Sequence, residues 1–128
     1  MDIVSIQHVA LTVPKGNANE ARRFFGELLS LEEMPRPGSL SEAGRDGIWY
    51  HVSGEQELHI QFRDDPKWDA SASDAHPAFV VDGLDELHAR LEVADIDVEE
   101  AIPIAGRKRF FARDPGGNRI EFLSFEKE

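Results

Sequence analysis

The sequence predicts an α+β fold that contains two βαβββ modules and a mixed sheet. Two observations support this prediction. Strand-like and helix-like patterns follow one another in the same order twice, on either side of a linker-like stretch at about 64–75. Each half also begins with a histidine in its first strand, in "HVALTV" and in "HPAFVV". We therefore place module one at about 4–63 and module two at about 76–126 of a single domain covering residues 1–128.

Module one contains each element of the predicted order. Residues 6–13 alternate apolar and polar side chains as a strand does, and residues 17–30 carry an apolar stripe at helical spacing. A short strand is expected at 31–34. Residues 35–47 are rich in Pro, Gly and Ser, so we interpret them as a long loop connection. A hairpin then follows at 48–63, where "IWYHVS" and "ELHIQFR" flank "GEQ".

Module two repeats the pattern. Residues 76–81 read as a strand, and 82–96 carry leucines at helical spacing. A further strand is expected at 98–103. The second hairpin pairs 108–113 with 118–125 around "DPGG", in which Pro fixes φ and the glycines permit positive φ. The strand after this turn places Glu121 on the face opposite to Ile120 and Phe122.

Composition excludes several classes of function. The net charge of -11 makes nucleic acid and anionic membrane surfaces improbable partners, because both require a basic face. The absence of cysteine excludes disulfides, thiolate metal sites and a cysteine nucleophile, and it favours a cytoplasmic location. We expect no signal peptide, because residues 1–13 contain neither a basic segment nor a small-residue cleavage site. We expect no transmembrane segment, because no apolar run approaches the length that spans a bilayer.

Four side chains stand out by their equivalent placement. His8 and His76 open the first strands of the two modules, and His59 and Glu121 lie inside the last strands. Strand alternation turns all four away from the face that packs on the helix of the same module. If the two modules form one curved sheet, the four groups converge in its concavity. Imidazole and carboxylate ligands together suit Zn, Ni, Mn, Co or Fe, and a catalytic metal keeps an open position.

With these residues the chain resembles the vicinal oxygen chelate superfamily, which includes glyoxalase I, fosfomycin- and bleomycin-resistance proteins and extradiol dioxygenases. The segments that carry the resemblance are "HVALTVP", "EARRFFGELLSL", "ELHIQF", "HPAFVVDGLDELHARL" and "RFFARDPGGNRIEFL". The resemblance implies paired βαβββ modules in a cupped mixed sheet with helices on the outer face, and a homodimer. It also implies that His8, His59, His76 and Glu121 bind one divalent metal ion that holds a small oxygenated substrate.

The resemblance leaves several reactions open. We favour glyoxalase-like proton transfer of the isomerase or lyase type, with Glu121 as the first candidate for the base and His59 as the second. His59 stands where glyoxalases carry a glutamate, which departs from that pattern. One alternative is an Fe(II)-dependent dioxygenase that uses His8, His76 and Glu121 as its triad. A fosfomycin-type activity ranks lower, because Ala10 stands where that group carries threonine.

The alternative outside enzymes is a metal-free drug-binding protein of the bleomycin-resistance type. The acidic charge and the aromatic residues Trp49, Tyr50, Trp68 and Phe111 are compatible with it. Among these residues, we expect Trp49 to form a pocket wall and Tyr50 to lie in the core, because adjacent strand residues face opposite sides. For the basic cluster Arg107, Lys108 and Arg109, contact with an anionic substrate is one interpretation and a solvated loop is the one that we favour.

Overall fold

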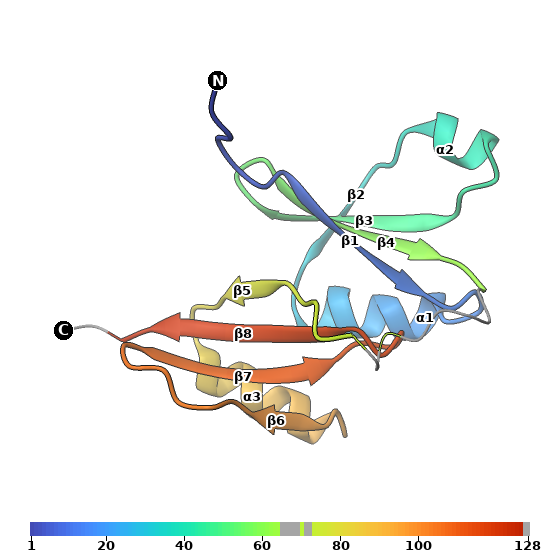
Figure 1. Cartoon of the computed structure of the whole chain (residues 1–128). Coiled ribbons are helices and arrows are strands. Elements are labelled where there is room, and N and C mark those ends of the chain that lie inside the picture. The colour runs from blue at the N-terminus through green and yellow to red at the C-terminus, as the bar shows by residue number, and fades with distance from the viewer. Residues whose placement is uncertain (65–69, 71–72, 127–128) are drawn as a thin grey trace. The chain divides into compact units, whose positions relative to one another are not determined.

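The computed structural model describes residues 1–64, 70 and 73–126 and divides the chain into two compact units, Met1–Pro66 and Lys67–Glu128 (Figure 1). Each unit contains one four-stranded mixed sheet and its own helices. The predicted α+β class with two modules is therefore confirmed. Most of the stretch that we interpret as the linker, including Trp68, lies outside the described residues.

Unit 1 follows the βαβββ order. Its strands are β1 (His8–Val13), β2 (Glu32–Met34), β3 (Gly47–Ser53) and β4 (Gln56–Phe62). The sheet order is β1-β4-β3-β2, in which β1 runs parallel to β4 and the other pairs are antiparallel. The parallel pair requires a long crossover, which the helical segment between β1 and β2 begins.

The helices of unit 1 differ from the prediction in two places. The predicted helix at 17–30 is divided into α1 (Ala18–Ala21) and a wider π-type helix, η1 (Arg22–Leu28), where Leu29 donates to the carbonyl of Phe24 at 3.0 Å. The interpretation of 35–47 as loop alone is wrong, because it contains α2 (Gly38–Glu42) directly after Pro37. This helix is too short to leave a periodic apolar pattern in the sequence.

Unit 2 repeats the arrangement with β5 (Ala78–Val80), α3 (Leu84–Val93), β6 (Val98–Glu100), β7 (Arg107–Arg113) and β8 (Arg119–Phe125). Its sheet order is β5-β8-β7-β6, with β5 parallel to β8. None of the helices in the described ranges has the length and apolarity that crossing a bilayer requires.

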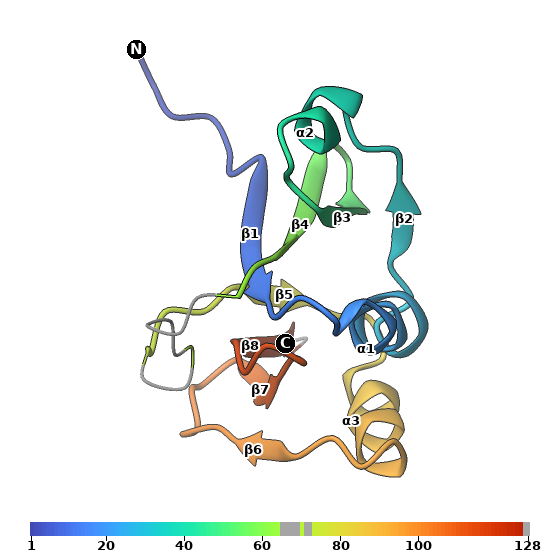
Figure 2. The ribbon, with the colours of Figure 1, turned by 90° about the vertical axis from the view of Figure 1, so that its right-hand side faces the viewer.

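The two faces of the unit 1 sheet have different roles. Leu58 and Ile60 of β4 are fully buried on the same side as Phe25 of η1, whose ring lies 5.9 Å from that of Tyr50. Figures 1 and 2 show α1 on this side of the sheet and α2 on the opposite side. Burying each large apolar side chain contributes about 1.5–3 kcal/mol. The core therefore fixes which side chains of β4 turn toward α2, and His59 is one of them.

Candidate functional site

His59 and Glu121 occupy equivalent register positions in the two units. Ala10 of β1 lies opposite His59 of β4, and Ala78 of β5 lies opposite Glu121 of β8. His8 precedes Ala10 by two residues, as His76 precedes Ala78. Two-residue spacing returns a strand side chain to the same face. Each unit therefore places one histidine beside one further ligand-type side chain at an equivalent point of its sheet.

In unit 1, the structure brings His8 and His59 together in a stack of three rings. The His8 and His59 centroids are 4.2 Å apart with planes at 16°, and Trp49 stacks on the other side of His59 at 3.8 Å and 2°. Trp49 lies opposite His59 in the β3–β4 register. The prediction that Trp49 forms a wall on this face is confirmed, and the stack fixes the plane of the His59 ring.

The hydrogen bonds of His8 determine which nitrogen it presents. Its Nδ1 lies 2.6 Å from Oε1 of Gln7, whose Nε2 donates to the carbonyl of Glu55 at 3.1 Å. An amide oxygen only accepts, so His8 donates through Nδ1–H and its Nε2 keeps a free lone pair. Metal-binding histidines in proteins typically donate their second nitrogen to an oxygen in this manner.

His59 differs, because Glu57 engages its Nε2. The Nε2–Oε1 distance is 2.8 Å, and this hydrogen bond is the main cause that lowers the pKa of Glu57. The nitrogen left for another partner is Nδ1. Sequence reasoning missed Glu57, although alternation along β4 already places it on the same face as His59.

In unit 2, the structure brings His76 and Glu121 together. His76 Nε2 lies 3.3 Å from Oε1 of Glu121, and its Nδ1 donates to the carbonyl of Asp74 at 2.8 Å. Because Nδ1 carries a hydrogen, a neutral His76 would direct its Nε2 lone pair at the carboxylate. A proton or a metal ion between the two atoms removes that repulsion. Glu121 is 7% exposed, so its carboxylate is largely removed from water.

Arg109 is the second partner of Glu121. Its Nη1 lies 3.2 Å from Glu121 Oε1, and its Nη2 donates to the carbonyl of Ile102 at 2.8 Å. The interpretation of residues 107–109 as a solvated loop is therefore wrong for Arg109. Strand β7 begins at Arg107, and alternation turns Arg109 toward the Glu121 side with 13% of its side chain exposed. The same guanidinium lies 5.5 Å from the Phe111 ring centroid.

The four predicted ligands thus occur as two pairs, one within each unit. In neither unit does the described part of the chain hold three or more His, Asp or Glu side chains grouped closely enough to bind a metal. The set of four stays a prediction. His51, which shares the parity of Trp49, directs its Nε2 to the carbonyl of Gly54 at 3.0 Å.

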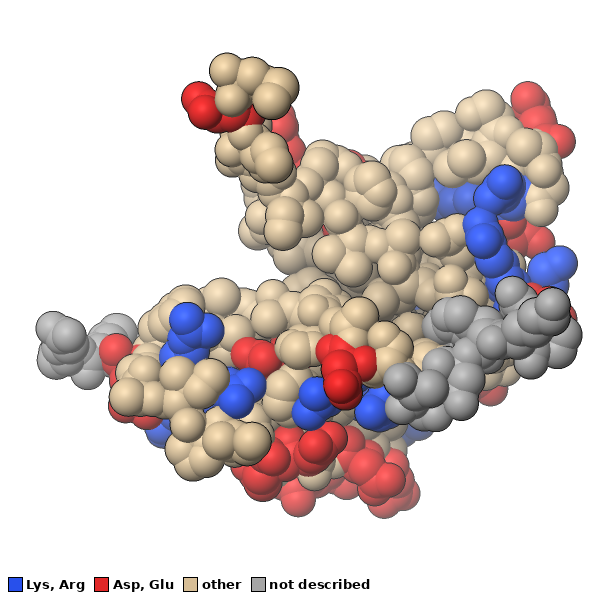
Figure 3. Space-filling view, in the orientation of Figure 1, with Lys and Arg blue, Asp and Glu red and all other residues tan. Residues whose placement is uncertain are grey.

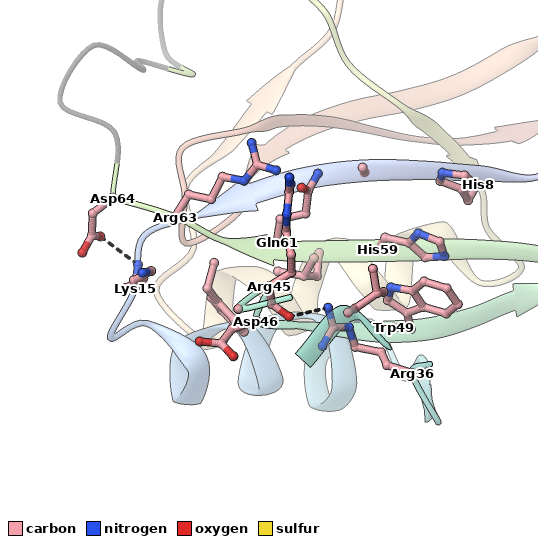
Figure 4. Close-up of a pocket in the computed structure, with 15 residues that line it drawn as sticks. His8, Lys15, Arg36, Arg45, Asp46, Trp49, His59, Gln61, Arg63 and Asp64 are labelled. Carbon is pink, nitrogen blue, oxygen red and sulfur yellow. Dashed lines mark hydrogen bonds between the residues drawn. The ribbon is translucent and has the colours of Figure 1, made fainter. Parts of the chain in front are cut away.

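A pocket of about 750 Å³ adjoins the ring stack of unit 1. Figure 4 shows His8, His59 and Trp49 toward one end and Arg45, Arg63 and Lys15 toward the other. The volume matches that of small-molecule sites. Tyr50, adjacent to Trp49, lies in the core as predicted, and burial raises its pKa to about 12. The residues of β3 and β4 therefore separate a packed face from a face that can hold a ligand.

Comparison with known proteins identifies similar sequences and folds. Residues 5–122 match the family model of the Glyoxalase/Bleomycin resistance protein/Dioxygenase superfamily. No curated protein matches the chain. A crystal structure described as a glyoxalase family protein from Bacillus anthracis is 36% identical, with 98% of each chain covered and a TM-score of 0.85.

More distant solved structures share the fold. Lactoylglutathione lyase from Agrobacterium tumefaciens is 21% identical over 97% of this chain and 96% of that one, with a TM-score of 0.70. The E126Q mutant of the fosfomycin resistance protein FosX from Listeria monocytogenes was solved with Mn(II) and 1S,2S-dihydroxypropylphosphonic acid. It is 17% identical over 98% and 93% of the two chains, with a TM-score of 0.74.

Proposed function

The chain belongs to the Glyoxalase/Bleomycin resistance protein/Dioxygenase superfamily, and we propose that it is a metal-dependent enzyme that moves a proton on a small oxygenated substrate. One observation carries the proposal. Equivalent register positions hold Ala10 opposite His59 and Ala78 opposite Glu121, and a histidine, His8 or His76, stands two residues before each alanine. If the two halves of a repeat contribute to one metal centre, each half is expected to carry ligand-type side chains at the matching positions.

The chemistry of these side chains fits a divalent first-row metal. His8 and His76 each donate Nδ1–H to an oxygen and present Nε2, which is the arrangement of metal-binding imidazoles. Glu121 contributes a buried carboxylate, whose Oε1 lies between His76 Nε2 at 3.3 Å and Arg109 Nη1 at 3.2 Å. We infer that His8, His59, His76 and Glu121 bind one ion of Zn, Ni, Mn, Co or Fe, within one chain or across a homodimer in the cytoplasm.

When bound, the metal supplies Lewis-acid stabilisation of an oxyanion or enolate on the substrate. The chain itself supplies the base. We assign the proton-accepting role first to the Glu121 carboxylate, which is the one carboxylate of the predicted set and is 7% exposed. His59 is the second candidate for the arrangement in which it stays outside the ligand set, because Glu57 holds its Nε2–H and leaves Nδ1 to accept a proton.

The bond between His59 and Glu57 also favours a second candidate function. If Glu57 keeps His59 outside the ligand set, the remaining residues are His8, His76 and Glu121. Two histidines and one carboxylate with open positions are the ligands of Fe(II) oxygenases. The second candidate is therefore an Fe(II)-dependent dioxygenase of the extradiol type.

The first experiment measures metal per chain by plasma mass spectrometry on protein purified without a His tag. We expect about one equivalent of metal per chain in the natural protein. Glu121→Ala should retain little metal after purification, because its affinity for the metal should fall about tenfold or more. Glu20→Ala, an exposed carboxylate in α1, is the matched control and should retain the metal.

The identity of the metal selects the activity assay. Iron directs the assay to catechols, whereas zinc, nickel, cobalt or manganese directs it to hemithioacetals and epimerisable acids. Protein that carries no metal and takes none up on dialysis would contradict the enzymatic proposal. The remaining interpretation would then be a ligand-binding protein of the bleomycin-resistance type.

A further inference from the structure

The pocket of unit 1 concentrates positive charge in a chain whose net charge is -11. Lys15, Arg36, Arg45 and Arg63 line it, against the two carboxylates of Asp46 and Asp64. The chain contains 25 acidic residues. Nevertheless, among the described residues none of these four cations forms an ion pair with a carboxylate. In the orientation of Figure 1, the space-filling view shows basic side chains of unit 1 gathered beside α2 (Figure 3).

The four cations come from three separate segments that meet at the pocket. Arg63 directly follows β4 on the face of Gln61 and His59, Arg36 and Arg45 flank α2, and Lys15 follows β1. Figure 4 shows Arg45, Gln61 and Arg63 among the side chains that line the pocket. Folding brings these cations, which are distant in sequence, into one pocket. Because like charges repel, each added cation makes the pocket less stable without a bound anion.

The loop that carries two of these arginines is held in place. Arg36 donates through Nη2 to the carbonyl of Arg45 at 2.9 Å. Its Nε is buried, and a β-carbon at Gly47 would lie 3.5 Å from that atom. The Arg36 stem is therefore wedged against β3, while Arg45 keeps an exposed side chain. A guanidinium on a backbone held in this way can form paired hydrogen bonds with an oxyanion.

We propose that Arg45 and Arg63, supported by Lys15 and Arg36, form a subsite for a negatively charged oxygen group of the ligand, either a carboxylate or a phospho group. Guanidinium groups match both geometries with paired hydrogen bonds. The ring stack of His8, His59 and Trp49 adjoins the same pocket, so the rest of the ligand lies toward His59. This inference rests on the proposed function only in assuming that the ligand is the substrate.

The test uses the full chain after exhaustive dialysis against a chelator, and again with the metal restored. Proton–nitrogen correlation NMR follows titrations with glycolate, with inorganic phosphate and with glycolamide, which is the neutral counterpart of glycolate. We expect glycolate or phosphate, but not glycolamide, to shift the signals of Trp49, Gln61 and Arg63. Affinity should fall severalfold between about 20 and about 300 mM NaCl. The stronger of the two anions identifies the chemical source of the charge.

Two variants test the assignment to these side chains. Arg45→Gln and Arg63→Gln should each raise the dissociation constant about three- to fivefold. Arg23→Gln is the matched control, because Arg23 is exposed in η1, outside the pocket, and carries the same charge. It should leave the constant unchanged. Both pocket arginines are exposed, and thermal unfolding verifies that each variant folds.

Two outcomes overturn the proposal: no saturable shift at these residues with either anion, or equal weakening in Arg23→Gln and the pocket variants. The metal-free titration separates this inference from the proposed function. Anion binding without any metal uptake would support the subsite and contradict the metal enzyme. Metal uptake without anion binding would support the metal enzyme and contradict the subsite.

Discussion

The carboxyl group of Asp114 organises the turn between β7 and β8. It accepts hydrogen bonds from the backbone amides of Gly116 and Asn118 and from the Asn118 side chain, each at 2.8 Å. Burial raises its pKa from the ordinary 3.8 to about 6, because the loss of hydration exceeds the effect of these hydrogen bonds. A residue that sequence analysis treats as a turn former is therefore also a source of pH dependence.

The pH dependence has a definite sign. Between about pH 4 and 6 the folded state holds the Asp114 proton and the unfolded state does not, so the stabilisation is present at low pH and is lost as pH rises through about 6. The total change is up to about 3 kcal/mol. We expect the stability advantage of the natural protein over Asp114→Asn to shrink by this order between pH 4 and 7.

Urea unfolding at several pH values measures this difference. Asp97→Asn, which removes an exposed carboxylate before β6, is the matched control for the loss of one negative charge. An Asp114→Asn variant whose stability parallels that of the natural protein from pH 4 to 7 would contradict the assignment.

At the scale of elements, the β3–β4 hairpin determines where the pocket residues lie. Gly47 pairs with Gln61, Trp49 with His59 and His51 with Glu57. The start of β3 runs so close to β4 that a β-carbon on Gly47 would overlap the carbonyl oxygen of Ile60. Glycine is thus required at this position by close approach of two backbones.

We expect Gly47→Ala to destabilise the protein by about 2 kcal/mol or more, because the strands must separate to admit the methyl group. It should also weaken anion binding in the unit 1 pocket, since Arg36 packs on the same glycine. Chemical unfolding and the glycolate titration measure the two effects.

Gly38→Ala provides the comparison. Gly38 opens α2 and has no atom within 4 Å of an added β-carbon. This change should be neutral or stabilising by up to about 1 kcal/mol, because alanine restricts the unfolded chain. Equal losses for the two alanine variants would mean that close packing at Gly47 is not the cause.

For the molecule as a whole, the proposed metal centre requires both units. His8 and His59 belong to unit 1, and His76 and Glu121 belong to unit 2. In the proposal, a single ion takes ligands from both, either within one chain or across a homodimer. Each unit alone offers two of the four side chains, which is fewer than catalytic metal sites normally use.

Paramagnetic Mn²⁺ tests this requirement directly. We expect added Mn²⁺ at less than one equivalent to broaden NMR signals around His8 and His59 and, in the same titration, those around His76 and Glu121. Mg²⁺ serves as the diamagnetic control, and Glu121→Ala should abolish the joint response. Broadening confined to one unit would contradict a shared centre.

The sequence indicated the modules and the faces of their strands correctly. Alternation along β4 and β8 separates Leu58 from His59 and Phe122 from Glu121, and burial in the structure follows the apolar set in β4. The repeat predicted equivalent places for the four side chains, and the register sets Ala10 opposite His59 and Ala78 opposite Glu121, two residues after His8 and His76. The equivalence of the four positions was therefore predictable, whereas their joint binding of a metal stays a prediction.

Other features depended on contacts that periodicity does not report. The π-type turn of η1, the helix α2 and the turn of Arg109 toward Glu121 were not foreseen. Nor was the selection of Nε2 as the free nitrogen of His8, which follows from Gln7 and Glu55. Each of these features depends on hydrogen bonds or packing contacts between residues that are close in the folded structure.

The sequence by itself determined the two-module α+β fold and the side of each strand on which candidate ligands lie, because solvent and core impose a two-residue period on every strand. Only the tertiary structure decided that Lys15, Arg36, Arg45 and Arg63 share a pocket, and that Glu57 and Arg109 engage His59 and Glu121. Charges on separate segments act together only at short range, and the path of the folded chain determines which of them become neighbours.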